Sequence, residues 1–199
     1  MAREFPTIEF ERYVDDAVVH CADERQARML REAITDRLAS VGLQVHPDKT
    51  RIVYCKDGTR RGSYEQTAFT FLGFTFRARA AWARGRTFTG FLPAISKDAL
   101  GKISAQVRSW RLHLRTGRQL ADLARTINPI VRGWMQYYGA FYRSALYPLL
   151  QRINAYLVRW LRKKYRRLRG FRKARACWQR ITTHQPLLFA HWRWVHSFW

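Results

Sequence analysis

The sequence predicts an α+β first part followed by an all-α second part. Short apolar runs broken by turn residues, with one amphipathic helix, fill residues 1–92, whereas long apolar stripes at helical spacing fill residues 93–199. Charge divides the chain at the same place. Residues 1–92 hold 15 basic and 12 acidic residues, and residues 93–199 hold 22 basic and 2 acidic residues. We therefore predict two domains, 1–92 and 93–199, with the boundary at Pro93.

A net charge of +23 over 199 residues predicts a polyanionic partner, because each neutralised phosphate releases condensed counterions. A membrane surface is the competing partner, but the sequence has no apolar segment long enough to span a bilayer and no secretory leader pattern. Cys21, Cys55 and Cys177 form no Cys-x-x-Cys pair, which favours reduced structural thiols over a zinc site. These observations predict a cytoplasmic protein, bacterial or organellar, without a membrane partner.

The first part is organised around the turn Tyr13-Val14-Asp15-Asp16, between extended segments predicted at Thr7–Arg12 and Ala17–Cys21. Adjacent carboxylates at a turn suit a hard cation such as Mg²⁺, which takes one or two carboxylates together with phosphate oxygens. Aspartates are also ordinary turn residues that bond their own backbone. The dipeptide alone leaves both interpretations open.

A helix and a loop are predicted after this turn. Asp23 caps the helix and Gly42 ends it. Its apolar stripe, which predicts packing on a sheet, consists of Ala27, Leu30, Ile34, Leu38 and Val41. A loop then leads into a strand expected at Arg51–Tyr54. Lys49 lies in this loop, where a solvated lysine of a Pro-Asp turn accounts for it equally well.

Two further extended segments complete the first part. The run Ala68–Arg77 is rich in phenylalanine, and its alternation changes face at Leu72-Gly73, which predicts a bulge or a close backbone approach. A second arm follows, in which arginines at 77, 79, 84 and 86 flank Trp82 and Gly85. Basic residues interleaved with an aromatic suit a nucleic-acid backbone. A solvated hairpin is equally consistent with them.

The second part is predicted to be a helical bundle. Ser96 caps a first helix, which we expect to run to Gly117. A second helix reaches Asn128-Pro129, where we expect a break or kink because proline lacks the amide donor. Pro148 opens a third helix.

The third helix ends in a run of cations, whose mutual repulsion outweighs the fraction of a kcal/mol gained from the helix dipole. We therefore predict that the run contacts phosphates. The predicted contacts are Arg159, Arg162, Lys163, Lys164, Arg166, Arg167, Arg169, Arg172 and Lys173. In the tail, His191 and His196 have no carboxylate partner, and we interpret them as packing or RNA-contact residues rather than metal ligands.

Several stretches resemble one known family in the same order. Tyr13-Val14-Asp15-Asp16 resembles the metal-binding turn of reverse transcriptases, and Phe71-Leu72-Gly73-Phe74 resembles their hairpin that holds the primer end. Residues 127–139, the basic run and the closing His-Trp segment resemble the maturase-specific domain of group II intron-encoded proteins. The resemblance implies a partial reverse-transcriptase palm over 1–92 and a thumb-like maturase domain, domain X, over 93–199. It adds Arg132 to the expected nucleic-acid contacts.

The resemblance also implies an RNA-directed DNA polymerase site, that is, a nucleotidyltransferase. Asp15 and Asp16 would be its catalytic Mg²⁺ ligands, and Lys49 would lie near the phosphates of the incoming nucleotide. In that family a third carboxylate comes from an earlier strand. The glutamates at 4, 9 and 11 do not stand in the family's motif. We therefore expect an incomplete site with weak or absent polymerase activity.

The expected function is to bind structured intron RNA and assist its splicing, with primer and template as further nucleic-acid partners. The alternative is a non-enzymatic RNA-binding splicing factor in which the palm remnant is a scaffold. A second polypeptide that supplies the fingers and the rest of the palm would complete the polymerase site. A split enzyme and a degenerate fragment both stay open on the sequence.

Overall fold

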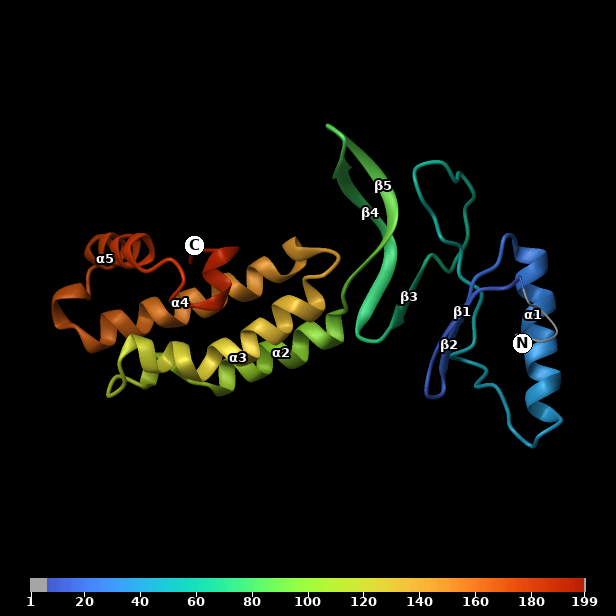
Figure 1. Cartoon of the computed structure of the whole chain (residues 1–199), viewed down its shortest axis with the longest axis horizontal. Coiled ribbons are helices and arrows are strands. Elements are labelled where there is room, and N and C mark those ends of the chain that lie inside the picture. The colour runs from blue at the N-terminus through green and yellow to red at the C-terminus, as the bar shows by residue number, and fades with distance from the viewer. Residues whose placement is uncertain (1–6, 199) are drawn as a thin grey trace. The chain divides into compact units, whose positions relative to one another are not determined.

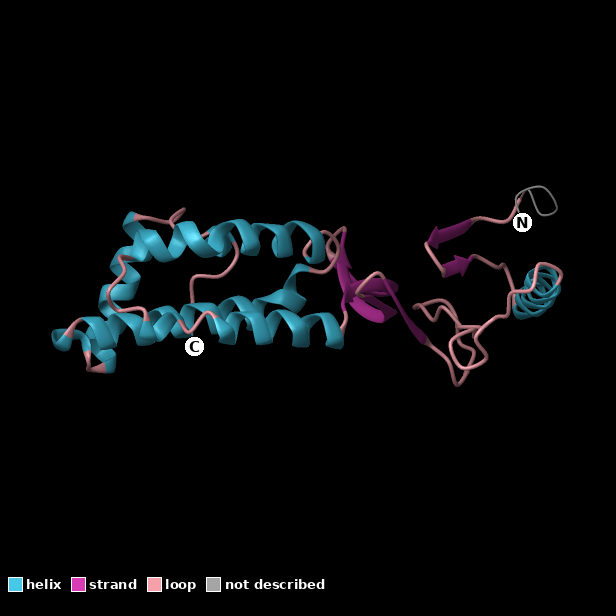
Figure 2. Cartoon of the chain, turned by 90° about the horizontal axis from the view of Figure 1, so that it is seen from below, coloured by secondary structure: helices cyan, strands magenta, loops and turns pink. Residues whose placement is uncertain are grey.

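The computed structural model describes residues 7–198, and its architecture is α+β, as predicted. The chain divides into two compact units (Figure 1). Of the described residues, the first unit holds those up to Phe71 together with Arg77–Gly90. The second holds Leu72–Phe76 and those from Phe91 onward. Strands lie in both units, whereas all helices after α1 belong to the second (Figure 2).

The first unit begins with an antiparallel hairpin of β1, Phe10–Tyr13, and β2, Asp16–Val19. Tyr13 pairs with Asp16 and Phe10 with Val19. Only Val14 and Asp15 stand between the two strands. The predicted hairpin is therefore present, with shorter strands than the sequence suggested.

Helix α1, Glu24–Ala39, has the predicted cap. The Oδ1 atom of Asp23 accepts a hydrogen bond from the Gln26 amide at 2.8 Å. Leu30 is buried, Ala27, Ile34 and Leu38 are half-buried, and Val41 beyond the helix is exposed. Gly42 takes the left-handed conformation expected of a helix terminator, with φ of 75°. The stripe prediction is thus correct for the helix itself and wrong at Val41.

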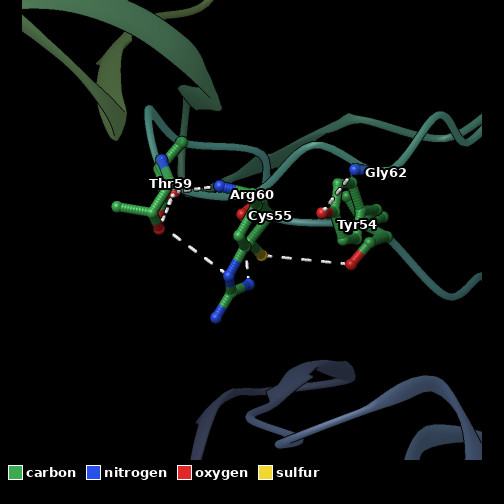
Figure 3. Close-up of polar contacts among 7 residues, drawn as sticks. Tyr54, Cys55, Thr59, Arg60 and Gly62 are labelled. Atoms are coloured by element: carbon green, nitrogen blue, oxygen red, sulfur yellow. Dashed lines mark hydrogen bonds and ion pairs between the residues drawn. The ribbon is translucent and has the colours of Figure 1, made fainter.

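The segment after α1 contains no strand, so the strand predicted at Arg51–Tyr54 is wrong. A compact loop stands there, held by contacts of its own, of which Figure 3 shows the polar ones. The Tyr54 hydroxyl accepts a hydrogen bond from the Gly62 amide at 3.2 Å. The ring centroids of Tyr54 and Tyr64 lie 4.3 Å apart. Arg60 donates to the Cys55 carbonyl at 3.1 Å. These local contacts satisfy the backbone without a neighbouring strand.

Asp57 organises the same loop. Its Oδ1 accepts from the Thr59 hydroxyl at 2.7 Å, from the Thr59 amide at 2.8 Å and from the Arg60 amide at 3.0 Å. The hydroxyl bond, followed by the amide bond from Thr59, lowers the pKa of this carboxyl from its ordinary value. The aspartate therefore stays charged and caps the turn.

A three-stranded sheet in the order β3-β4-β5 follows: β3 is Ala68–Phe71, β4 is Phe74–Ala83 and β5 is Arg86–Ile95. Leu72 and Gly73 both have positive φ, as do Arg84 and Gly85. Two-residue connections of this conformation match the twist of antiparallel strands. Of the two alternatives predicted at Leu72-Gly73, the bulge is wrong, because the change of face marks a hairpin turn. The close backbone approach is confirmed, since a Cβ at Gly73 would lie 3.3 Å from the Tyr138 hydroxyl. Pro93 lies within β5, an edge strand that tolerates a missing donor.

The second unit is a bundle of helices joined by short 3₁₀ segments (Figure 1). The α-helices are α2, Lys97–Ser109; α3, Leu120–Tyr138; α4, Tyr147–Lys164; and α5, Phe171–His184. The 3₁₀ segments are η1, Leu112–Leu114; η2, Arg143–Leu146; η3, Arg166–Leu168; and η4, Ala190–Arg193. The predicted Ser96 cap of α2 and the Pro148 opening of α4 are both present. Helix α5 was not predicted.

Two helix boundaries differ from the prediction. Helix α2 ends at Ser109 rather than Gly117, because Arg111 turns left-handed with φ of 45° and begins η1. Helix α3 continues through Pro129 without the expected break. Its neighbours Ile127 and Val131 are buried, so tertiary packing offsets the hydrogen bond that proline cannot make.

One hydrophobic core draws on all four helices and the closing segment of the second unit. Two buried asparagines bind that segment to the helices. Asn128 donates to the Leu188 carbonyl at 2.9 Å and accepts from the Ala190 amide at 2.8 Å. Asn154 donates to the carbonyls of Val195 and Ser197, and its Oδ1 accepts from the Trp192 indole at 2.9 Å.

His191 belongs to the same core. It is fully buried, and its Nε2 lies 2.7 Å from Asn154 Oδ1. Because the Asn154 amide nitrogen already donates to two carbonyls, its Oδ1 must accept and His191 Nε2 must carry a proton. Desolvation, reinforced by His196, lowers the pKa of His191 to about 3. His191 is thus a neutral packing residue, the first of its two predicted roles.

Candidate metal corner and nucleic-acid interface

The two aspartates lie at the tip of the β1–β2 hairpin. Asp15 is in the turn, Asp16 is the first residue of β2, and both are exposed. Val14 has φ of 56°, a conformation that β-branched residues rarely adopt. The Arg12 side chain donates to the Val14 carbonyl at 2.9 Å and so holds the strained residue. Tyr13, Val14 and both carboxylates therefore form a fixed, solvent-facing corner.

This corner fits a hard divalent cation in part. Adjacent exposed carboxylates supply the oxygen ligands that Mg²⁺ prefers, and Mg²⁺ commonly takes only one or two of them beside phosphate oxygens. Within residues 7–198, no group of three or more His, Cys, Asp or Glu side chains could hold a metal ion. Asp15 and Asp16 can thus contribute two ligands, with the rest left to water and substrate.

Lys49 lies in the loop that follows α1 and is exposed. In the described part of the chain it forms no hydrogen bond and no ion pair, including with the two aspartates. The loop around it closes through a hydrogen bond from the Thr50 amide to the His46 carbonyl at 2.9 Å. Its predicted role beside nucleotide phosphates stays a prediction.

The cationic run after Val158 forms a surface on the second unit. Four of its residues, which we call the cationic depression, line a shallow hollow of about 350 Å³: Arg159, Arg162, Lys163 and Arg169. All four are exposed, and no acidic residue lines the hollow. The Arg162 Nε donates to the Arg169 carbonyl at 2.9 Å, and the Arg159 guanidinium lies 5.5 Å from the Tyr156 ring centroid. The fold therefore gathers cations from α4 and the segment after it.

The other predicted cations lie outside the hollow. Arg166, Arg167, Arg172 and Lys173 are exposed on η3 and α5, and Arg132 is exposed on α3. Lys164 differs, because its Nζ donates to the Arg118 carbonyl at 2.6 Å and lies 5.1 Å from the Trp160 ring centroid. The ammonium group of Lys164 is thus already engaged by contacts within the protein, and it links α4 to the segment before α3.

An aromatic hollow on the second unit was missed from the sequence. About 340 Å³ in volume, it is lined by Phe74, Gly133, Gln136, Tyr137, Ala140 and Phe141. The Tyr137 hydroxyl donates to the Leu72 carbonyl at 2.9 Å, and the Phe74 and Phe141 rings meet edge to face at 5.5 Å. Gly133, Gln136 and Tyr137 stand at helical spacing on one face of α3. Nothing in the sequence pairs that face with Phe74.

Both parts of the chain match family models. A model described as reverse transcriptase (RNA-dependent DNA polymerase) matches residues 1–76, which include the two-aspartate corner. A model described as group II intron, maturase-specific domain matches residues 100–178, which include the cationic depression. The chain belongs to the group II intron reverse transcriptase and maturase family. Its palm segment precedes its maturase-specific segment, in the order that the motifs predicted. No curated protein matches the chain.

The two matches contain the candidate site residues. Reverse transcriptases generally use a divalent metal, and Asp15 and Asp16 lie within the reverse-transcriptase match. Arg132 and the run from Arg159 to Lys173 fall inside the maturase-specific match. No helix among the described residues is long and apolar enough to cross a membrane.

Proposed function

We propose that this intron-encoded protein grips folded intron RNA through its helical unit and thereby assists splicing. The observation that carries the proposal is the cationic depression, four exposed cations gathered without an acidic residue inside the maturase-specific segment. Cations placed this closely repel one another, and a polyanion relieves that repulsion.

The geometry favours phosphate oxygens as the ligand. Arg162 is held through its Nε, which leaves the terminal guanidinium nitrogens as donors, and Arg159 is steadied against Tyr156. A guanidinium held in this way loses little freedom when it forms a paired bond to a phosphate. Three arginines and one lysine in one hollow therefore suit a folded backbone that brings several phosphates together.

Salt dependence of RNA binding tests the proposal. A variant with all four cations neutralised should have a slope of log K against log salt that is less steep by about 3 units, since each phosphate contact contributes nearly one unit. Its substitutions are Arg159→Gln, Arg162→Gln, Lys163→Gln and Arg169→Gln. A group II intron transcript and filter binding over a range of salt concentrations supply the measurement. The matched control neutralises four exposed arginines of α1: Arg25, Arg28, Arg31 and Arg37.

Both variants lose the same net charge, so a general electrostatic effect would flatten the two plots equally. An unchanged slope in the depression variant, or equal changes in both variants, would contradict the proposal.

At the two-aspartate corner, we propose that Asp15 and Asp16 hold Mg²⁺, which when bound would neutralise phosphate charge there. We further propose that the chain alone extends a primer on RNA weakly or not at all, because only two carboxylates meet at the corner in the described residues. Primer extension with Mg²⁺, compared between the unchanged chain and Asp15→Ala, provides the test. Robust synthesis that depends on Asp15 would contradict this proposal.

A non-enzymatic splicing factor is the second candidate, and the two-carboxylate corner favours it. In that case Asp15→Ala with Asp16→Ala should leave RNA affinity and splicing rate unchanged. A loss of splicing at unchanged RNA affinity would instead assign the aspartates an active role.

We also propose that a second polypeptide completes the palm. Within residues 7–198 the β1–β2 sheet has two strands, and every residue of β1 is exposed. A two-stranded sheet is marginally stable alone, and its open edges accept further strands. Sedimentation of this chain mixed with a reverse-transcriptase fingers-and-palm fragment should give a heterodimer. Two separate boundaries at micromolar concentration would rule the partner out.

A further inference from the structure

The most exposed large apolar side chain in the described residues is Trp82, at 73% of its full area. It is the last residue but one of β4 and is followed by Ala83 and then by the turn. Tryptophan carries a large apolar face that soluble proteins normally cover. Within the described chain Trp82 makes no ring contact and no hydrogen bond, so nothing in the fold requires an indole there.

Arginines lie close to this indole in the sequence. Residues 77–90 contain four arginines and no acidic residue. Arg84 is in the turn and Arg86 begins β5. Both are exposed, and neither forms an ion pair in the described residues. Trp82 and Arg86 both lie within a few residues of the turn, but Arg86 stands opposite Ala83, so its side chain and that of Trp82 leave opposite faces of the strand pair. The turn residue Arg84 is therefore the cation that follows the indole most closely along the chain.

The turn conformation adds an independent observation. Arg84 has φ of 51° and Gly85 has φ of 76°. The first position of such a turn favours asparagine, aspartate or glycine, and a longer side chain is strained there by about 1–2 kcal/mol. An arginine at this position costs stability and projects a cation from the tip of the hairpin. Local strain of this kind concentrates at sites that bind ligands.

A second basic segment lies beside β5. The Gly58 amide donates to the Thr89 carbonyl at 2.9 Å and so docks the Tyr54–Tyr64 loop on the free edge of the sheet. A Cβ at Gly58 would lie 3.4 Å from that carbonyl oxygen, so the approach is close. The loop exposes Arg60 and Arg61. The open edge of the hairpin is thus covered by a loop that also carries cations.

We propose that the tip of the β4–β5 hairpin binds an unpaired stretch of RNA, with Trp82 stacked on a base and Arg84 on a flanking phosphate. An exposed ring flanked by cations is the recurring device for single strands, because every base has a face that stacks and every linkage carries a charge. In a duplex the bases are already stacked on one another, so the indole discriminates against paired RNA. The partner class follows from the proposed RNA-binding function, but the residues are separate from the cationic depression.

The test uses the full chain with two RNA probes, an oligoadenylate single strand and a blunt duplex of the same length. Trp82→Ala should weaken single-strand binding roughly 5- to 150-fold, the range for loss of one stacked base, and leave duplex binding unchanged. Trp82→Phe retains a stacking face and should restore most of the affinity. Leu187→Ala, which truncates a similarly exposed side chain, is the control.

Arg84→Asn separates charge from fold. Asparagine tolerates the left-handed conformation, so this variant should fold at least as well as the unchanged chain while binding the single strand more weakly. Thermal melts of all variants check that the fold is intact.

Equal loss of both probes in Trp82→Ala, or no loss of either, overturns the inference. If the chain binds structured RNA through the cationic depression but ignores Trp82, only this inference fails. If it binds no RNA at low salt, the proposed function fails as well.

Discussion

The two units of this protein are stabilised in different ways. The second unit contains nearly every buried apolar side chain of the described residues, including Trp160, Trp178 and Trp192. Among the described residues of the first unit, Leu30 alone is a buried apolar residue, at 1% exposure. Apolar burial supplies most of the favourable free energy of folding. We therefore expect the second, helical unit to be the more stable of the two. The first unit should depend on local turns, helix caps and contacts with further partners.

The largest expected effect is in the core of the helical unit. Trp192→Ala should lower its free energy of unfolding by about 3–5 kcal/mol, because Trp192 is fully buried and its indole donates to Asn154. Urea denaturation followed by near-ultraviolet circular dichroism measures the change. Trp82→Ala, in the exposed hairpin, should change stability by less than about 0.5 kcal/mol. Equal effects would remove the contrast between the units.

A pair of glycine substitutions on α3 sharpens the account of packing. At Gly139 a Cβ would overlap the Trp194 ring and the Met135 carbonyl, so Gly139→Ala should destabilise by about 1–3 kcal/mol. At Gly133 a Cβ meets nothing within 4 Å, so Gly133→Ala should stabilise by up to about 1 kcal/mol. Thermal unfolding of both variants should give melting shifts of opposite sign. Shifts of the same sign would contradict the packing at Gly139.

The pH dependence of stability tests the buried histidine. Because burial lowers the His191 pKa from 6.5 to about 3, the unfolded chain takes up its proton first as the pH falls. The contribution of neutral His191 to the free energy of unfolding is therefore fully present above pH 6.5 and declines toward pH 3. About 1.4 kcal/mol of it is lost by pH 5.5. Urea denaturation at pH 8 and at pH 5.5 gives the difference in the free energy of unfolding between the two pH values. His191→Gln should reduce this difference by about 1.4 kcal/mol. An unaltered difference in the variant would mean that His191 is accessible to protons.

The smallest expected effects are at the two helix caps, one in each unit. Ser96→Ala should cost about 1 kcal/mol or more, since the Ser96 hydroxyl accepts from the Ala99 amide at a buried position. Asp23→Ala should cost less, about 0.5–1 kcal/mol, because water can replace the exposed cap of α1. Native-state hydrogen exchange resolves the two helices separately. A larger loss at Asp23 would reverse the proposed order of stability.

The sequence was informative wherever the signal is local. The caps at Asp23 and Ser96, the helix start at Pro148 and the turn at Tyr13–Asp16 each depend on residues within four positions of one another. Predictions failed where distant contacts decide. Helix α3 passes through Pro129 because its neighbours are buried in the core, and the expected strand at Arg51–Tyr54 is replaced by a loop with its own ring and hydroxyl contacts.

The candidate sites divide in the same way. The two aspartates are adjacent in sequence, so the motif alone identified the corner. The cationic run was visible in the sequence as composition. The sequence did not show that four of its residues line one hollow, because this depends on the turn after α4. Nor did it show that Lys164 binds the Arg118 carbonyl, which is 46 positions away. The aromatic hollow joins Phe74 to α3 and has no sequence signal at all.

The amide anchors of Asn128 and Asn154 also bear on how the protein is made. Both asparagines find their partners at Leu188–Ser197, after every helix of the bundle has been synthesised. While the ribosome still holds that stretch, the helices carry two unsatisfied amides and a vacant place for Trp192. The interior of the bundle therefore cannot be completed before residues 188–197 have been synthesised, and a premature stop shortly before residue 188 would release a chain with every α-helix of the bundle encoded and no completed interior.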